Sequence, residues 1–266
     1  MTRTKHDNRE AAVAIIKQLR ASGYTALFAG GCVRDMLLER PAKDHDVVTD
    51  ATPDRLTELY PRARRVGAKF GVILVRKFGH DIEVATFRTE GAYSDGRRPD
   101  SVTFATDRED AARRDFTING LFYDPLEDRV FDYVNGRADI AARVIRTIGD
   151  PGDRFSEDHL RMLRAVRFAA ALDFAIDPDT MSALRVHAPK LRAISTERIW
   201  MELERILTDR SRATGWRLIL ESGLRPYLVE EWTPNDALDH GALARLAALP
   251  EGPIGAAPAL AAVLHA

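Results

Sequence analysis

The sequence has a single cysteine, no excess of either charge and no long apolar run. Cys32 stands alone, so no disulfide bond can form within the chain, which fits a reducing compartment. The first ten residues are polar and charged, unlike a secretory signal peptide. No apolar run approaches the length of about 20 residues that crosses a bilayer. The sequence therefore argues against a disulfide scaffold or a membrane-spanning protein and predicts a cytoplasmic location.

The balance of charge gives no support for nucleic-acid binding. Lysine and arginine total 39 and aspartate and glutamate total 40, for a net charge of −1. A strongly basic protein would have indicated a polyanionic partner, so any such partner must be recognised by locally placed arginines. The length of 266 residues allows one large domain or two ordinary ones.

The first half of the chain alternates short apolar runs with turn signals. Helical spacing before Gly23 predicts a helix over Asp7–Ser22, a short helix is expected around Val33–Leu37, and Thr52-Pro53 can begin another. The segment Arg88–Ser101 is rich in Gly, Arg and Asp and is expected to be an exposed mobile loop. Strands are predicted at Tyr24–Ala29, His45–Thr49, Gly71–Phe78, Asp81–Phe87 (after a turn at Gly79-His80), Leu121–Tyr123 and Val130–Tyr133.

The pattern becomes helical after Gly149-Asp150-Pro151-Gly152, with little strand signal. Ser156 can cap a helix that runs to about Asp173. Further helices are expected at Asp179–His187, Thr196–Leu207, Arg212–Ser222 and Ala242–Leu249. The boundary between an α/β unit and a helical unit is therefore predicted near residue 150.

Two carboxylates mark the start of the second predicted strand. Side chains alternate along a strand, so Asp44 and Asp46 should point to the same face. Two ionised carboxylates repel each other unless a cation lies between them, and such oxygen ligands suit Mg²⁺ with substrate phosphates. An Asp-x-Asp pair alone is equally consistent with solvated turn residues. Glu83, on a neighbouring predicted strand, could be a third metal carboxylate or an outward-facing residue.

A glycine turn about ten residues earlier makes the metal interpretation more specific. Gly30-Gly31 lies between a predicted strand and helix, where backbone N–H groups can approach phosphate oxygens. Arg34 can supply a charge-assisted contact to a phosphate, although a surface salt bridge to Asp35 is the simpler alternative.

Four segments together resemble the class II tRNA nucleotidyltransferases and bacterial poly(A) polymerases. Phe28–Leu38 with Lys43–Val48 is similar to the family's first motif, and Arg113–Asn119 resembles the second. Ile148–Pro151 with Arg154–Phe168 resembles the neck motif that reads the incoming base, and Ser195–Leu207 is similar to the next helical motif. The order and spacing hold from about residue 25 to 225.

The resemblance implies an α+β fold, with a polymerase-β-like nucleotidyltransferase palm of mixed sheet and helices followed by an all-helical neck and body. The implied division is a palm at 1–150, a neck that recognises the base at 151–210, and the start of a body domain, possibly truncated, at 211–266. The implied activity is CCA addition, the transfer of CMP and AMP from CTP and ATP to a tRNA 3′ end with release of pyrophosphate. The implied catalytic metal ligands are Asp44 and Asp46, and the implied nucleotide-binding residues are Gly31, Arg34, Arg114, Asp115, Asp158, Arg161, Arg164 and Arg167.

The residues from Asp158 onward suggest how a protein could choose C and A without a template. A carboxylate accepts from the exocyclic amine of cytosine or adenine, while an arginine donates to the neighbouring ring nitrogen. Uracil and guanine present the reverse pattern. Asp158, Arg161, Arg164 and Arg167 recur every three residues, which is also typical of a solvated helix face with i,i+3 salt bridges.

The sequence is consistent with three functions. In the family, a loop like Glu90–Pro99 is needed for terminal adenosine addition, which favours CCA addition over CC addition. An A-only adding enzyme or a poly(A) polymerase shares the same motifs. A non-catalytic RNA-binding relative is a third possibility, although such a protein has no reason to keep both Asp44 and Asp46. The sequence does not indicate an oligomeric state.

Overall fold

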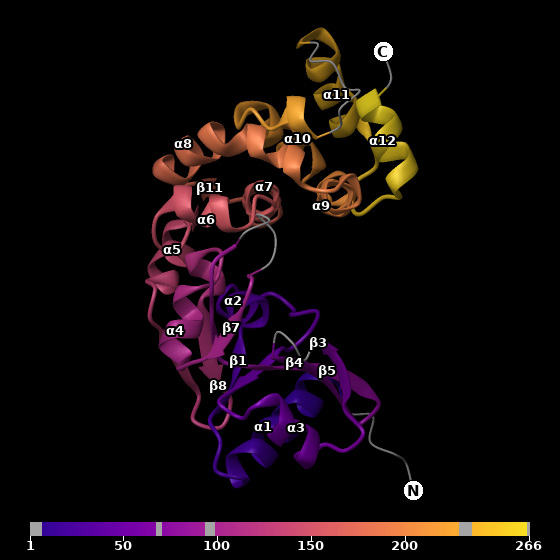
Figure 1. The fold of residues 1–266 in the computed structure, drawn as a ribbon. Helices are drawn as coiled ribbons and strands as arrows, with labels where there is room; N and C mark the ends of the chain where they lie inside the picture. Colours follow the sequence, from indigo (N-terminus) through magenta and orange to yellow (C-terminus); the bar gives the residue numbers. More distant parts are fainter. Residues whose placement is uncertain (1–6, 68–70, 94–98, 229–235, 265–266) are drawn as a thin grey trace, which may run out of the picture. The chain divides into compact units, whose positions relative to one another are not determined.

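A computed structural model describes residues 7–67, 71–93, 99–228 and 236–264. The chain forms two compact units: the first comprises residues up to Ala92 and Pro99–Ala141, and the second comprises the residues from Ala142 onward together with Tyr93. Figure 1 shows the sheet in the first unit and the array of helices in the second. The finer division into palm, neck and body stays a prediction.

The first unit is built on a seven-stranded mixed sheet in the order β3-β4-β5-β2-β1-β8-β9. Strand β2 is parallel to β5, and the other neighbouring strands of this sheet are antiparallel. Strands β1, β2 and β8 are buried along their whole length because they lie at the centre of the sheet. The strands are β1 (Ala26–Ala29), β2 (Val47–Thr49), β3 (Arg64–Gly67), β4 (Val72–Lys77), β5 (His80–Thr86), β8 (Leu121–Asp124) and β9 (Arg129–Asp132).

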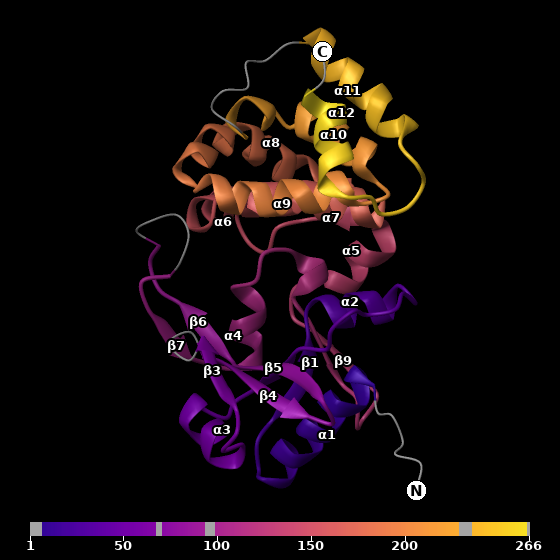
Figure 2. The same ribbon diagram turned by 90° about the vertical axis from the view of Figure 1, so that its right-hand side faces the viewer.

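Helices α1 (Asn8–Ala21) and α3 (Pro53–Leu59) cover one face of this sheet (Figure 2). Helix α1 begins with a capping box between Asp7 and Glu10, and it buries an apolar stripe that includes Ile15 and Leu19. Thr52 is the N-cap of helix α3, and its hydroxyl accepts the N–H of Arg55. Pro53 follows at the first helical position, which proline favours.

The opposite face carries an apolar cluster that includes Leu27, Val48, Phe87 and Phe122. Helix α4 (Asp107–Ala112) contributes Ala111 to this cluster. The remaining elements of the unit are α2 (Gly31–Leu37), the 3₁₀ turn η2 (Thr117–Asn119) and α5 (Gly136–Ala142).

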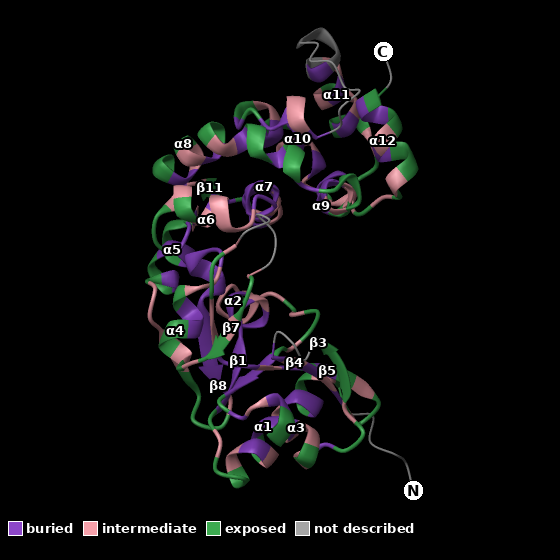
Figure 3. Cartoon of the chain, viewed as in Figure 1, coloured by how far each residue is buried: buried purple, intermediate pink, exposed green. Residues whose placement is uncertain are grey.

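The second unit is an array of helices around α7, which Figure 3 shows to be mostly buried. Helix α7 packs against α9 and α10. The helices are α6 (Pro151–Glu157), α7 (Arg161–Leu172), α8 (Pro178–His187), α9 (Thr196–Thr208), α10 (Arg212–Glu221), α11 (Asp236–Ala248) and α12 (Ala256–Leu264), with 3₁₀ turns η3 (Ala188–Ala193) and η4 (Arg225–Tyr227). Across the described residues, no helix combines the length and apolar character that a bilayer span requires.

The predicted continuous helix from Ser156 to Asp173 is wrong. Helix α6 ends at Glu157, and α7 begins at Arg161. Asp158 between them has an extended backbone (φ −136°, ψ 106°), and its Oδ1 accepts the N–H of Leu160 at 3.1 Å. An aspartate that bonds to the backbone two residues later favours a turn over a helix interior.

Three smaller expectations also need correction. The segment from Arg88 was expected to be a loop, but β6 (Arg88–Glu90) pairs with β7 (Val102–Phe104); residues 94–98 lie outside the described part of the chain. The turn between β4 and β5 is Phe78-Gly79, both with positive φ as a two-residue hairpin turn requires. The helical unit contains a parallel ladder of β10 (Val144–Ile145) and β11 (Ala175–Ile176), which the sequence did not indicate.

Gly136 is the position in the first unit where a side chain is least tolerable. An added Cβ would overlap the Thr117 carbonyl oxygen and lie 3.0 Å from Leu121 Cδ2. We expect Gly136→Ala to lower the free energy of unfolding by about 1–3 kcal/mol, because overpacking forces backbone movement. Denaturant titration would measure this loss. Gly255→Ala is the matched control, since its nearest neighbour would be Pro258 Cδ at 3.8 Å; an equal loss in both variants would contradict the packing explanation.

Candidate active site

Asp44 and Asp46 lie in the extended segment that leads into β2. The Asp46 carbonyl accepts the Ala29 N–H at 3.2 Å, so the pairing with β1 continues past the end of the strand. His45, between the two carboxylates, points toward α1: its Nδ1 lies 3.0 Å from Asn8 Oδ1, and its ring centroid lies 5.3 Å from that of Phe28. Alternation therefore directs Asp44 and Asp46 to the sheet face opposite α1.

Glu83 shares this face. Strands β2 and β5 are parallel with Val47 beside Val84, so the register continues to Asp46 beside Glu83. Glu83 is exposed, whereas its neighbours Ile82 and Val84 are buried on the other face. Throughout the described residues, no three His, Cys, Asp or Glu side chains form a group that could hold a metal ion. Glu83 thus adds negative charge beside Asp46 without completing a three-carboxylate group.

Burial and the neighbouring charges both change the pKa of the Asp46 carboxyl. Burial, followed by the negative charges of Glu83 and Asp44, raises the pKa of the Asp46 carboxyl from 3.8 to about 6, against the opposing effect of Arg114. Asp46 is nevertheless an exposed residue, so solvent screens these charges in part. A cluster of negative charge at this face, which Arg114 offsets only in part, is thus suited to a cation.

The glycine turn brings Arg114 close to the backbone. Gly30 has φ +71°, and a Cβ added there would lie 3.1 Å from Arg114 Nη1. Arg114 donates to Asp110 Oδ2 through Nε and Nη2, at 3.1 and 2.9 Å, and its guanidinium lies 5.1 Å from the centroid of the Phe122 ring. Glycine is required at this turn both for its positive φ and for the close approach of the arginine.

Asp110 anchors two arginines, and the sequence did not identify it. Its side chain is fully buried, and it accepts from Arg113 at Oδ1 as well as from Arg114 at Oδ2. Burial alone would raise the pKa of Asp110, but Arg114 and Arg113 outweigh burial and lower it below its usual value. Arg114 therefore forms an ion pair with Asp110, four residues earlier in the chain.

Asn119 is a second residue that the sequence did not single out as part of the site. Its Oδ1 accepts from Arg34 Nη1 at 2.8 Å, and its Nδ2 donates to Asp115 Oδ1 at 3.1 Å. Arg34 also pairs with Asp35 at 2.7 Å, as the simpler alternative supposed. The amide therefore links Arg34 to Asp115. Arg34 and Asn119 are 85 residues apart along the chain, so no local motif spacing could show this contact.

The four remaining candidates lie in the second unit and all have charged or aromatic neighbours. Arg161 is buried and pairs with Glu157. Arg167 Nε donates to Glu202 Oε2 at 2.6 Å, and the guanidinium groups of Arg164 and Arg167 lie 5.3 and 4.3 Å from the centroid of the Phe168 ring.

Asp158 pairs with Arg198 at 3.3 Å, from the turn before α7. Asp158 lies outside α7. Only Arg161, Arg164 and Arg167 therefore keep the predicted spacing of three residues on a single helix.

Comparison with known proteins identifies the family of this chain. The family described as "Poly A polymerase head domain" matches residues 26–146, and that described as "Probable RNA and SrmB- binding site of polymerase A" matches residues 173–235. The CCA-adding enzyme of Geobacillus stearothermophilus is 46% identical over 220 residues, which are 82% of this chain and 54% of that protein. The CCA-adding enzyme of Latilactobacillus sakei is 41% identical over 240 residues, 90% of this chain and 59% of that protein.

The chain belongs to the class II tRNA nucleotidyltransferase and bacterial poly(A) polymerase family. Its fold agrees with the crystal structure of the Bacillus stearothermophilus CCA-adding enzyme in complex with CTP, with a TM-score of 0.80 and 40% identity over 91% of this chain and 58% of that one. A tRNA nucleotidyltransferase complexed with a primer tRNA and an incoming ATP analog gives a TM-score of 0.71 at 27% identity, over 88% of this chain and 66% of that one. The predicted α+β fold, a polymerase-β-like head with a helical body, is thereby confirmed.

Family membership indicates dependence on a divalent metal ion. The chain spans about half the length of the curated relatives that it matches.

Asp46→Asn should stabilise the protein when divalent ions are removed. The folded pKa of about 6 exceeds the ordinary value of 3.8, so the ionised carboxyl opposes folding, and stability falls as pH rises from about 4 to above 6. Such a shift corresponds to about 3 kcal/mol for a shielded group, and exposure to solvent reduces it to about 1 kcal/mol. Denaturant titrations in EDTA at pH 4.5 and pH 7.5 would measure this gain. It should appear mainly at pH 7.5, and a loss of stability there would contradict the proposed repulsion.

Proposed function

We propose that this protein adds CMP and AMP from CTP and ATP to the 3′ end of tRNA, completing the CCA sequence, by phosphoryl transfer assisted by Mg²⁺. The observation that carries the proposal is the Asp44–Asp46 pair beside Glu83, where burial and then charge repulsion raise the pKa of Asp46 to about 6. The relatives that match most of this chain are CCA-adding enzymes. The reaction belongs in the cytoplasm, where the triphosphates are available.

Asp44 and Asp46 would hold the metal ions. Two carboxylates supply only part of a Mg²⁺ shell, which fits an ion that keeps several waters and binds substrate phosphates. When bound, the ions would activate the attacking 3′ oxygen and neutralise charge on the leaving pyrophosphate. The donor set fits Mg²⁺ because carboxylate oxygen is the hard ligand that this ion prefers.

The other residues of the first unit would position the nucleotide. Arg114, close to the Gly30 backbone, would contact the triphosphate, as would Arg34 beside Gly31. Asp115 would contact the ribose, and Asn119 would fix it relative to Arg34. Phosphoryl transfer depends mainly on such positioning and on charge stabilisation, so no covalent nucleophile is required.

The polar residues of the second unit would select the base. The Asp158 carboxylate would accept from the exocyclic amine of cytosine or adenine, and an arginine among Arg161, Arg164 and Arg167 would donate to the ring nitrogen. The pairs of Asp158 with Arg198 and of Arg161 with Glu157 hold these side chains in place before a base arrives. A base with the reversed donor and acceptor pattern would leave these groups unsatisfied, which lowers its affinity.

The activity test uses tRNA that lacks CCA. With Mg²⁺, CTP and ATP, the protein should add three nucleotides, and Asp44→Ala should reduce transfer at least 1,000-fold (~4 kcal/mol) while tRNA binding changes less than threefold. Labelled product on a gel and filter binding measure the two quantities. Asp54→Ala, an exposed carboxylate on α3, is the matched control and should retain activity.

The same assay separates the alternatives. Because the matching family is described as a poly(A) polymerase head domain, an A-only activity is the second candidate. Use of ATP with no use of CTP on the CCA-less acceptor would establish it. A wild-type protein that binds RNA but shows no transfer with Mg²⁺ would favour a non-catalytic relative.

Base selection should depend on Asp158. We expect Asp158→Asn to lower kcat/KM for CTP about 10- to 100-fold, as for the loss of a hydrogen bond worth about 1–3 kcal/mol. The variant should also show a smaller preference for CTP over UTP. Single-nucleotide addition with labelled CTP and UTP measures both effects. Asp179→Asn, an exposed carboxylate in the first turn of α8, should leave the preference unchanged. Wild-type use of UTP equal to that of CTP would overturn the base-reading proposal.

A further inference from the structure

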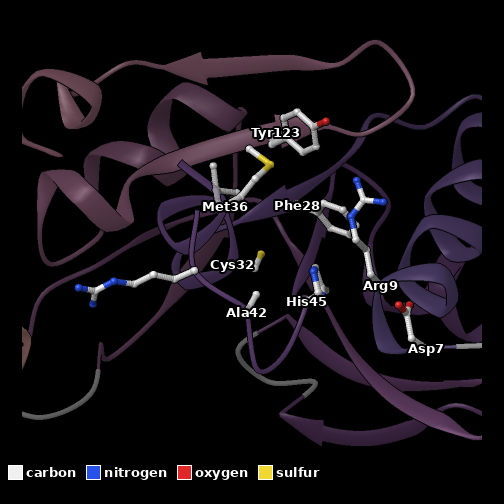
Figure 4. Close-up of a pocket in the computed structure, with 10 residues that line it drawn as sticks. Asp7, Arg9, Phe28, Cys32, Met36, Ala42, His45 and Tyr123 are labelled. Atoms are coloured by element: carbon white, nitrogen blue, oxygen red, sulfur yellow. The ribbon is translucent and has the colours of Figure 1, made fainter. Parts of the chain in front are cut away.

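Two further groups of side chains lie in the first unit. One lines a cavity of about 260 Å³, beside which Figure 4 shows Phe28 and Tyr123. These residues are only 3% and 7% exposed, and their ring centroids are 6.3 Å apart, so the rings contribute packing. The other group is a network of ion pairs around Asp110 that reaches Arg114. Because Arg114 would contact the triphosphate, this network bears on how the nucleotide is held.

The Glu90 carboxylate lies at the end of β6 and binds two arginines. Its side chain is 8% exposed, and its Oε1 accepts from Arg88 Nη2 at 2.9 Å and from Arg113 Nη1 at 2.8 Å. Burial, followed by the charge of Arg113, lowers the pKa of Arg88, against the opposing effect of Glu90. These charges are largely buried, so water screens their interaction only weakly.

Arg113 connects Glu90 to Asp110. Its Nη2 and Nε donate to Asp110 Oδ1 at 2.7 and 2.9 Å, while its Nη1 donates to Glu90. The guanidinium is planar and presents its donors in a fixed geometry, so the positions of the two carboxylates depend on one another. A lysine would supply the same charge without this geometry.

Asp110 carries the connection on to Arg114. Its second oxygen, Oδ2, accepts from Arg114 Nη2 at 2.9 Å and from Arg114 Nε at 3.1 Å, within a fully buried side chain. One oxygen of this carboxylate thus binds Arg113 and the other binds Arg114. A rotation of the carboxylate that follows a movement of Arg113 therefore changes the orientation of Arg114.

We propose that Glu90 is a positioning residue for the nucleotide: through Arg113 and Asp110 it holds Arg114 in the orientation that receives the triphosphate. This inference rests on the proposed function, to which the triphosphate contact of Arg114 belongs.

Charge and positioning predict opposite effects when Glu90 is neutralised. The network joins three arginines to two carboxylates: Arg88, Arg113 and Arg114 with Glu90 and Asp110. Glu90→Gln removes a negative charge, so electrostatic attraction alone would strengthen the binding of an anionic triphosphate. Loss of the positioning contact would weaken that binding. The direction of the change therefore identifies the role of Glu90.

Equilibrium titration of the whole protein with CTP and with ATP, in the presence of Mg²⁺, measures this direction. We expect Glu90→Gln to weaken the binding of both triphosphates about 10-fold, the effect of losing one charge-assisted hydrogen bond. The KM values for CTP and ATP should rise by the same factor, because Arg114 would contact phosphate and not the base. Glu127→Gln is the matched control, since it removes the same charge from an ion pair with Arg20 and should bind like the wild type.

A second variant tests the connection itself. Arg113→Lys keeps the charge of the network and removes the planar fork, so it should also weaken CTP binding. The double variant should bind CTP no more weakly than the weaker of the two single variants, because both changes interrupt one connection. Thermal melting shows whether Glu90→Gln is folded, and Arg113→Lys decides the matter if it is not.

Tighter or unchanged CTP binding by Glu90→Gln would overturn the inference, as would a loss confined to one of the two triphosphates or multiplying effects in the double variant. A lower melting temperature with unchanged affinity would show that Glu90 only stabilises the fold. The proposed function fails separately: a wild-type protein that binds CTP but transfers nothing to tRNA contradicts that function alone. Transfer by the wild type with unchanged binding in Glu90→Gln contradicts only the positioning role.

Discussion

The repulsion among Asp46, Asp44 and Glu83 is the interaction on which the candidate site depends. The sheet holds these groups together because β2 is parallel to β5 and the chain before β2 continues the same register. Partial burial raises the pKa of Asp46 to about 6 while solvent still reaches the side chain. The fold therefore tolerates a local cost in stability to keep a cation-binding arrangement, and hydrophobic packing elsewhere in the unit offsets that cost.

The second feature of the site is its buried network of arginines and their partners. Asp110 fixes Arg113 and Arg114, while Asn119 links Arg34 with Asp115. A guanidinium held at both edges loses little conformational entropy when a phosphate binds. Glycine at position 30 allows Arg114 to lie against the backbone, so the turn and the arginine form one structural unit.

The two faces of the segment that carries Asp44 and Asp46 have different chemistry. One face presents carboxylates, and the other presents His45 to Asn8 and Phe28. This difference follows from the alternation of side chains in extended backbone, which lets one stretch of three residues present carboxylates on one face and pack a ring beside α1 on the other.

The sequence by itself determined the local elements and the family. Capping residues such as Asp7 and Thr52, and apolar runs such as Ala26–Ala29, specify their helices and strands through contacts within a few residues, and the motif residues occur at fixed spacing. Only the tertiary structure decided what depends on distant partners: the placement of Glu83 beside Asp46 and the link from Arg34 through Asn119. The β10–β11 ladder is of the same kind, since each strand is only two residues long and leaves no periodicity to detect. Such features arise when packing brings together residues far apart in the chain, and no local pattern encodes that proximity.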